Sequence, residues 1–364
     1  MVDLANRRIL CFATQGHDHL DADRLSYLLE PLHPETYPFD HAKKARSALG
    51  LARKVRAQRP SLIVMEGTGL AGGVTLLAIN LLLRAPFVVS SGDAVGPYLR
   101  LRSRAAGLLG GAYERLLCRR CAGYIGWTPY LAGRALTFGA ARAMTAPGWT
   151  RGHPSVGARQ AIRARLGIPE DALVIGLAGS LNWRPRVGYA YGAEIVGAVQ
   201  RVQRPDVVAC VVGDGPGLER LRQMAGEDLG SRIFLPGRVP AAEVADYLAA
   251  FDVASLPQSV DGVGSFRYST KLSEYLGAEL PIITGQIPAA YDLDGGYFWR
   301  LPGATPWGET YVEALAALLR ELTPATIAEH REAIRDRPLG LFDQPAQQRR
   351  TSEFIRDILS SPHA

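Results

Sequence analysis

Residues 260–284 place charged side chains beside a glycine turn, in a spacing that suits the binding of an anion. Gly264 lets the backbone turn sharply and approach a ligand closely. Arg267, Lys271 and Glu274 follow at intervals of four and three residues, so on a helix they would share one face. A helix that begins after such a loop and presents two cations can bind an anion. These residues leave open the alternative of a solvated polar face on an ordinary crossover helix.

The same segment is predicted to form a loop, a short helix and a buried strand. Four large side chains recur at helical spacing and are expected to face a core: Tyr268, Leu272, Tyr275 and Leu276. Gly277 is placed to end the helix, and Pro281 precedes the apolar pair that would begin the strand.

Short β-branched runs alternate with helical patterns along the chain, which predicts α/β domains built on parallel sheets. Strands are expected at residues 8–14, 61–65, 87–89, 124–127, 173–178, 207–212, 232–235 and 253–256. Longer helical patterns cover residues 97–121, 186–202 and 241–250. Pro and Gly cluster over 147–154, and the alternation then restarts. We therefore expect two domains and a final helical segment, with the bounds 1–150, 151–340 and 341–364.

Three residues stand just after strands of the predicted first sheet: Gly16, Glu66 and Asp93. In open parallel sheets, ligands bind beyond the carboxyl ends of the strands. Each of these residues alone is typical of a turn. Three of them at one edge of the sheet predict a ligand-binding cleft.

The positive charge of the chain is concentrated in its first half. The 364 residues carry a formal net charge of +6. From Arg100 to Arg165 there are twelve arginines, and Glu114 is the only acid. Within 97–121, leucines and arginines recur at helical spacing, which fits either an amphipathic surface helix or a patch for an anionic membrane or acceptor. This helix lacks interleaved aromatic residues, which argues against a nucleic-acid partner.

Metal, redox and membrane-spanning roles are not favoured. The seven histidines are scattered, so we expect no metal site. Cys118 and Cys121 form a Cys-x-x-Cys pair inside an arginine-rich helical pattern, without a second pair of ligands nearby. The longest apolar run, 74–83, is too short to span a bilayer, and the first residues do not resemble a signal peptide. A cytoplasmic location is therefore expected.

Four segments of the second half resemble, in order, the donor-domain motifs of one family. They are GLAGSLNWRP (176–185), VVGDGPGLERL (211–221), IFLPGRVPAAEVADYLAAFDVASLPQ (233–258) and KLSEYLGAELPIIT (271–284). The family is that of the nucleotide-sugar glycosyltransferases with the GT-B fold, in particular the retaining family four (glycosyl transferases group 1). The first half resembles this family only in its layout. The resemblance implies two Rossmann-like α/β domains facing across a cleft, with a C-terminal helix that crosses back to the first domain.

The resemblance also implies roles for individual residues. Arg184, or Arg186 in its place, would neutralise the leaving diphosphate, and Lys271 would lie beside the donor sugar and diphosphate. Glu274 would bind the donor ribose, and Asp93 would touch the transferred sugar or the acceptor. The further donor-binding residues that it implies are Gly16, Ser180, Asn182, Gly213, Arg238, Val239, Gly264 and Ser265.

The activity implied is transfer of a sugar from a UDP- or GDP-sugar to a small-molecule, glycan or lipid-linked acceptor. The resemblance implies retention of configuration, no metal and no cofactor apart from this co-substrate. Two positions depart from the family: Phe266 stands where a first glutamate is usual, with Asp261 as a candidate substitute, and Ser180 stands near the first position of the usual Arg and Lys pair. They leave open a non-catalytic partner or scaffold protein and a sugar-nucleotide epimerase of similar fold. The expected location is the cytoplasm or the inner face of the membrane, with peripheral association through 97–121.

Overall fold

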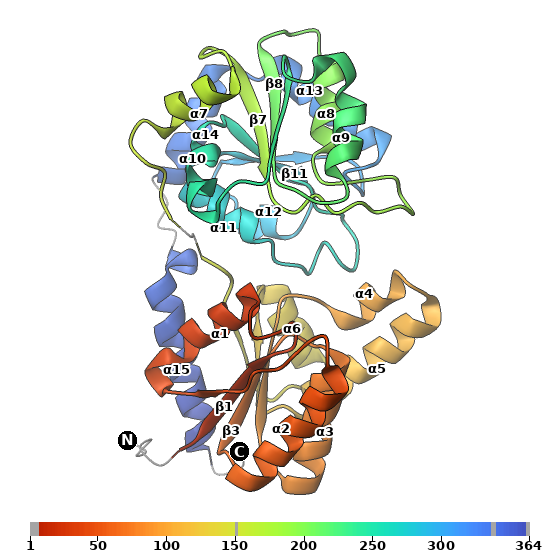
Figure 1. Ribbon diagram of the computed structural model, residues 1–364, viewed down its shortest axis with the longest axis vertical. Coiled ribbons are helices and arrows are strands. Elements are labelled where there is room, and N and C mark those ends of the chain that lie inside the picture. The colour runs from red at the N-terminus through yellow and green to blue at the C-terminus, as the bar shows by residue number, and fades with distance from the viewer. Residues whose placement is uncertain (1–6, 150–151, 336–339, 362–364) are drawn as a thin grey trace. The chain divides into compact units, whose positions relative to one another are not determined.

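Two parallel sheets organise the chain, one in each of two units (Figure 1). The computed structural model describes residues 7–149, 152–335 and 340–361. The first unit contains the residues up to 148, residues 266–268 and the residues from 340 onward, and the second contains 149–265 and 269–339. The predicted boundary between residues 150 and 151 lies outside the described residues.

The sheet of the first unit has six parallel strands in the order β2-β1-β3-β4-β5-β6. They are β1 (Ile9–Ala13), β2 (Glu35–Thr36), β3 (Leu62–Glu66), β4 (Phe87–Ser91), β5 (Gly123–Gly126) and β6 (Ala143–Thr145). Successive side chains of a strand point to opposite faces of its sheet. All residues of β1, β3 and β4 are buried, because helices cover both faces.

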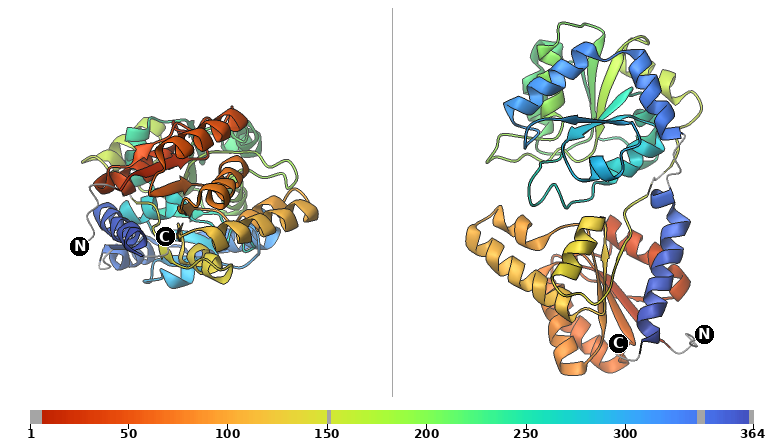
Figure 2. Two further views of the ribbon diagram at one scale, coloured as in Figure 1. Left: turned by 90° about the horizontal axis from the view of Figure 1, so that it is seen from below. Right: turned by 180° about the vertical axis from the view of Figure 1, so that it is seen from behind.

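Six helices follow the strands of the first unit and a seventh ends the chain. They are α1 (Leu20–Leu29), α2 (Lys44–Gln58), α3 (Leu70–Leu83), α4 (Val95–Arg100), α5 (Arg104–Arg120), α6 (Pro129–Thr137) and α15 (Gln344–Ser360). Side chains of α2, α3, α5 and α6 pack on one face of the sheet, and side chains of α1 and α15 pack on the other. Ile355, Ile358 and Leu359 of α15 are buried there, so the C-terminal helix returns to the first sheet, as predicted. The views from the front and from behind both show α4 and α5 as a hairpin that projects from this unit (Figures 1 and 2).

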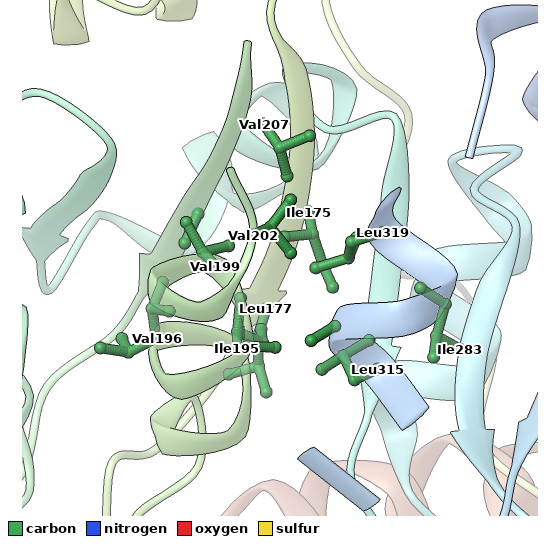
Figure 3. Close-up of a cluster of buried hydrophobic side chains, with 14 of the residues drawn as sticks. Ile175, Leu177, Ile195, Val196, Val199, Val202, Val207, Ile283, Leu315 and Leu319 are labelled. Carbon is green, nitrogen blue, oxygen red and sulfur yellow. The ribbon is translucent and has the colours of Figure 1, made fainter. Parts of the chain in front are cut away.

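The sheet of the second unit is also six-stranded and parallel, in the order β12-β11-β10-β7-β8-β9. The strands are β7 (Leu173–Ala178), β8 (Val207–Val212), β9 (Ile233–Gly237), β10 (Val253–Leu256), β11 (Ile282–Gly285) and β12 (Phe298–Leu301). The helices are α7 (Ala158–Leu166), α8 (Ala193–Arg201), α9 (Leu218–Ala225), α10 (Val244–Ala249), α11 (Thr270–Gly277), α12 (Ala289–Asp292), α13 (Glu309–Glu321) and α14 (Pro324–Arg335). Figure 3 shows the main core, in which Ile195 and Val199 of α8 and Leu315 of α13 pack against Ile175 and Leu177 of β7.

Two predicted helices are shorter in the structure than their sequence patterns. The helix predicted over 186–202 begins only at Ala193, because the chain from 179 to 192 forms a loop stabilised by an antiparallel bridge between Arg184 and Tyr189. The segment 241–250 is a 3-10 turn followed by α10. The structure also contains β6, α7, α12 and β12, which were not predicted.

Arg267 and Tyr268 were wrongly assigned to the helix of the segment 260–284. That helix, α11, begins at Thr270, so Arg267 and Tyr268 do not share a helical face with Lys271 and Glu274. They pack instead within the first unit, where Arg267 Nε lies 3.3 Å from Asp93 Oδ1. The hydroxyl of Thr128 donates to the Phe266 carbonyl oxygen at 2.8 Å.

Candidate functional site

Loops at one edge of the second sheet gather the charged residues. In this sheet β8 lies on one side of β7, and β10, which comes later in the chain, lies on the other side. The direction in which successive strands are added therefore reverses at β7. Such a switch point is where ligands bind in open α/β sheets. The loops beyond the carboxyl ends of these three strands begin at residues 179, 213 and 257.

Glycines let the loops after β7 and β8 pack directly on each other. Gly179, Gly213 and Gly215 have φ angles of +154°, +143° and +147°, which strain residues with side chains. A Cβ on Gly215 would lie 2.7 Å from the Leu181 carbonyl oxygen, and a Cβ on Gly213 would collide with the carbonyl oxygen of Gly179. The Leu181 amide donates to the Asp214 carbonyl oxygen at 2.9 Å. Gly213, predicted to bind the donor, is therefore also required for the packing of the two loops.

Two of the predicted catalytic cations converge on one aromatic ring. The guanidinium carbon of Arg184 lies 5.3 Å from the centroid of the Tyr191 ring, and Nζ of Lys271 lies 5.4 Å from it. Arg184 Nη2 donates to the Tyr191 hydroxyl at 3.2 Å. The Lys271 ammonium lies against Gly179, where any side chain would collide with it. The aromatic ring and the glycine turn hold the two cations in position and leave them uncovered. Cations placed in this way can neutralise the phosphates of a ligand that binds beside them.

A buried carboxylate anchors the loop that carries Arg184. Glu194 Oε2 accepts from the Tyr189 hydroxyl at 2.8 Å and from the Gly192 amide at 3.0 Å, and Oε1 accepts from the Ser255 hydroxyl at 3.0 Å. The amide of Arg184 in turn donates to the Tyr189 carbonyl oxygen at 2.8 Å. Burial raises the pKa of Glu194 even though the three hydrogen bonds oppose this rise. The network fixes the loop end from which Arg184 and Tyr191 project.

Glu194→Gln should make the stability of the protein less sensitive to rising pH. Because its pKa is higher in the folded protein than in the unfolded chain, the contribution of Glu194 to stability falls as the pH rises above the ordinary value of 4.5. Glutamine keeps an acceptor for Tyr189 and Gly192 but does not ionise. The difference in free energy of unfolding between variant and wild type should therefore grow in favour of the variant above about pH 4.5, as urea titrations at several pH values can measure.

The matched variant Glu194→Ala is the control, because its effect on stability should be a loss that is present at every pH. It leaves two hydroxyls and one backbone amide without their acceptor in the core, so we expect a loss of about 3 kcal/mol or more at every pH. A stability difference for Glu194→Gln that does not change with pH would contradict a raised pKa for this carboxyl group.

The other predicted residues of the second unit differ in exposure and in the loop or helix that carries them. Ser180, Asn182 and Arg186 are exposed in the loop after β7, and Glu274 is half-buried on α11, one helical turn from Lys271. Arg238 and Val239 follow edge strand β9, where the Gly213 amide donates to the Gly237 carbonyl oxygen at 2.9 Å. Arg238 is exposed and Val239 is half-buried.

The loop that contains Gly264 and Ser265 is closed by Asp261. Oδ1 of Asp261 accepts from the amides of Val263 and Gly264, both at 2.8 Å, and the Ser265 amide donates to its carbonyl oxygen at 3.0 Å. These contacts give Asp261 a local turn-forming role. A side chain on Gly264 would collide with the carbonyl oxygen of Ser259.

In the first unit, Gly16 and Asp93 lie beyond the carboxyl ends of two strands. Gly16 follows β1 with a φ of +123°, which favours glycine at this turn. Asp93 follows β4 and forms the ion pair with Arg267. The ion pair places a guanidinium beside the carboxylate that was predicted to touch sugar or acceptor.

A buried ion pair that the sequence did not reveal stabilises the same edge of the first sheet. Arg24 Nη1 lies 2.7 Å from Glu66 Oε2, and Trp127 Nε1 donates to Glu66 Oε1 at 3.1 Å. Arg24 also donates to the hydroxyl of Ser90 and to the carbonyl oxygen of Ala146. Burial raises the pKa of Glu66, although the Arg24 charge opposes the rise. Glu66, which was noted only as a strand-end residue, is thus part of an ion pair that joins α1 to the ends of β3, β4, β5 and β6.

Within the described residues, no group of three or more His, Cys, Asp or Glu side chains is arranged to hold a metal ion. Cys118 and Cys121 are buried, and burial raises the pKa of both thiols to about 12. In the part of the chain that the structure describes, no helix combines the length and apolar character needed to cross a bilayer.

Sequence reasoning missed Tyr191, Glu194 and Trp307. Tyr191 holds both cations, and Trp307 packs on Tyr189 with ring centroids 5.3 Å apart and on Arg184 at 5.9 Å. No spacing rule connects residue 307 to a loop more than a hundred positions earlier. Glu194 begins an apolar helical run, and its burial is the one feature that the sequence could have suggested.

The fold of the chain resembles that of known structures. The structure of Anabaena HepE in complex with UDP resembles this chain with a TM-score of 0.70 and 17% identity, over 96% of this chain and 100% of that one. Sucrose-phosphate synthase from Thermosynechococcus elongatus resembles it with a TM-score of 0.71 and 14% identity, over 97% and 100%. WaaG, a glycosyltransferase involved in lipopolysaccharide biosynthesis, gives a TM-score of 0.64 and 14% identity over 97% and 100%.

The sequence comparison locates the relationship in the second unit. No curated protein matches the sequence significantly. Residues 172–321, from β7 to the end of α13, match the model of the family glycosyl transferases group 1. The second unit thus carries a segment that matches the glycosyl transferases group 1, and the chain as a whole shares its fold with the structures named above.

Proposed function

We propose that the protein transfers a sugar from a UDP- or GDP-sugar to an acceptor, with Arg184 and Lys271 stabilising the diphosphate that leaves. The observation that carries this proposal is their convergence on Tyr191, beside the glycine turns at the switch point of the second sheet. Such a site would offer two positive charges to a diphosphate bound beside the glycine turns. The likeness to HepE, whose structure contains UDP, supports a uridine nucleotide as the first donor to test.

The chemistry assigns separate tasks to the charged residues. The bond between the anomeric carbon and the diphosphate oxygen breaks, and negative charge develops on that oxygen. Fixed cations are worth most where charge develops, because they act on the transition state more than on the bound donor. Arg184 and Lys271 would stabilise this negative charge. Glu274 would accept hydrogen bonds from the two ribose hydroxyls.

We further propose a retaining, metal-independent reaction. The cation pair supplies the charge that a divalent ion would otherwise contribute. The departing phosphate oxygen could accept the proton of the acceptor hydroxyl, so no dedicated protein base is required. In this proposal Asp93 and its partner Arg267 orient the sugar or the acceptor, which is a small molecule, a glycan or a lipid-linked sugar. The enzyme would act in the cytoplasm, at the inner face of the membrane where the acceptor carries a lipid.

A screen of nucleotide sugars tests the proposal. Ligands that bind the folded state raise Tm by mass action, so UDP-glucose or a related donor at about 100 times its Kd should stabilise the protein by roughly 2.7 kcal/mol. Slow hydrolysis of the same donor, which releases the nucleoside diphosphate, should accompany binding.

The outcomes separate the proposal from the two alternatives. If no UDP- or GDP-sugar raises the Tm of the protein, both the glycosyltransferase and the epimerase hypotheses would be excluded, and a scaffold protein would be favoured. Conversion of a UDP-sugar into its epimer without transfer would favour an epimerase. Release of the nucleoside diphosphate with retained anomeric configuration in the product would support the retaining transfer.

A further inference from the structure

Exposed apolar side chains are concentrated on neighbouring helices of the first unit. Among the described residues, eighteen large hydrophobic side chains are exposed, and ten of them lie on α3 or on the α4–α5 hairpin. These ten are Leu70, Val74, Leu81, Leu82, Leu83, Tyr98, Leu101, Leu108, Leu109 and Leu116. Leu82 and Leu108 are each 77% exposed. A soluble surface seldom gathers apolar side chains in this way without a partner.

The exposed residues form a stripe along each of the two long helices. On α5 the exposed positions are 104, 105, 108, 109, 112, 115, 116, 119 and 120, which follow the helical repeat. On α3 they are 70, 74, 78 and 81–83, and none of these side chains is charged. The opposite sides of both helices are buried against the same face of the sheet, through Leu76 and Ile79 of α3 and Leu117 of α5.

The two helices are also joined directly. The Tyr113 hydroxyl of α5 donates to the carbonyl oxygens of Thr68 and Gly69 at 3.2 and 3.3 Å, at the start of α3. A side chain on Gly73 of α3 would collide with that same hydroxyl. The two stripes therefore belong to one rigid layer, which we call the α3–α5 face.

The charges of this face have one sign. Exposed arginines stand among the leucines, at 100, 102, 104, 115, 119 and 120. Residues 67–92 and 94–113 contain no acid. Glu114, the one acid of α5, is buried and forms an ion pair with Arg134, with Nε 2.8 Å from Oε1. The face thus presents apolar and cationic groups with no carboxylate among them.

A cavity adds a second feature at one end of the face. It has a volume of about 570 Å³ and lies between the C-terminal ends of α3 and α5, where Arg84, Arg120 and Arg142 line it. Arg142 donates to the Asp357 carbonyl oxygen and to the Ser361 hydroxyl. For Arg84 and Arg120 no ion pair is present among the described residues. The cavity is large enough for a phosphate-containing headgroup and carries the matching charge.

We propose that the α3–α5 face binds the surface of an anionic lipid bilayer. The leucines would enter the boundary of the acyl chains, and the arginines would contact the lipid phosphates, as in helices that lie in the membrane interface. The aliphatic composition favours a bilayer over a folded protein, because protein interfaces concentrate aromatic anchors and this face has only Tyr98. The proposal extends the predicted patch 97–121 to α3, and it does not depend on the sugar donor.

Co-sedimentation of the full chain with vesicles tests the proposal. Vesicles that contain phosphatidylglycerol should bind the protein, and pure phosphatidylcholine vesicles should bind it at least about tenfold more weakly, because the arginines then have no net anionic surface to attract them. Binding should weaken as the ionic strength rises from about 0.05 to 0.5 M, since salt screens the attraction. Arg84→Gln/Arg120→Gln should weaken binding to the anionic vesicles.

Matched leucine variants locate the binding face. Leu108→Ser/Leu109→Ser on α5 and Leu81→Ser/Leu82→Ser on α3 should each reduce binding at least about tenfold. Leu49→Ser on α2, which is 61% exposed in the same unit, should leave binding unchanged. Absence of binding to anionic vesicles at low salt would overturn the proposal, and full binding by the α3 variant would overturn the role of α3. Dimers in solution that disappear in the leucine variants, without lipid binding, would identify a second copy of the chain as the occupant instead.

Discussion

Lys271→Ala should reduce kcat by about 100- to 1000-fold, the range found when one charge-stabilising group is removed from an active site. The physical reason is the position of the Lys271 ammonium beside Gly179 and over Tyr191. In the proposed mechanism it would there stabilise the charge that develops on the leaving diphosphate. The side chain is one of two cations on this ring, so activity should fall without being abolished. Release of the nucleoside diphosphate under saturating donor measures the effect.

The control for Lys271→Ala is Lys44→Ala, an exposed lysine of α2 in the other unit, which should leave kcat unchanged. Arg184→Ala should also lower kcat, and the double variant should lose less than the product of the two single effects, because both cations act through one ring and one ligand. Equal kcat values for Lys271→Ala and wild type would remove the cation pair from the mechanism. A drop in kcat together with a large loss of Tm would show a structural role instead.

The strands were the part of the fold that sequence predicted best, because buried parallel strands are continuous β-branched runs. The second sheet illustrates this, since β7, β8 and β10 begin and end at the predicted residues. The runs are visible because a strand covered on both faces is predominantly apolar along its length. The edge elements β6 and β12 lack this signature, since several of their residues are only half-buried.

Helical periodicity failed where tertiary contacts decide the conformation. Tyr268 has the spacing of a helical core residue, and it is indeed buried, but its core is that of the first unit and it stacks edge-on against Trp127. The segment 186–192 was predicted to be helical, but it forms a loop. A hydrogen bond from the Arg184 amide to the Tyr189 carbonyl oxygen stabilises this loop, and so does the bond from the Tyr189 hydroxyl to the buried Glu194. Both errors arise from partners that are distant in sequence.

The candidate site also contains residues that sequence motifs predicted and residues that only tertiary contacts reveal. Arg184 and Lys271 could be named from the motif resemblance, whereas Tyr191, which contacts both, and Trp307, which contacts Arg184, could not. Phe266 is an instructive case, because the motif predicts a glutamate there. In the structure its ring packs against the core of the first unit, with the Arg134 guanidinium 5.3 Å from its centroid. The position where the resemblance predicts a glutamate thus carries a side chain that packs within the first unit.

Glu274→Ala should raise the KM for the nucleotide sugar by about 10- to 100-fold, with a smaller effect on kcat, because one or two hydrogen bonds to a charged group are lost in both the bound donor and the transition state. Glu274 is half-buried on α11, and no other residue was assigned to the ribose. The matched variant Glu274→Gln keeps one acceptor, so its KM should lie between those of the alanine variant and wild type, and Tm should change little in either variant.

A 2′-deoxyribose donor gives an independent check. Wild type should bind it more weakly than the ribose donor, whereas Glu274→Ala should not distinguish the two. If the variant still prefers the ribose donor by the wild-type ratio, another residue binds the ribose and the assignment of Glu274 is wrong.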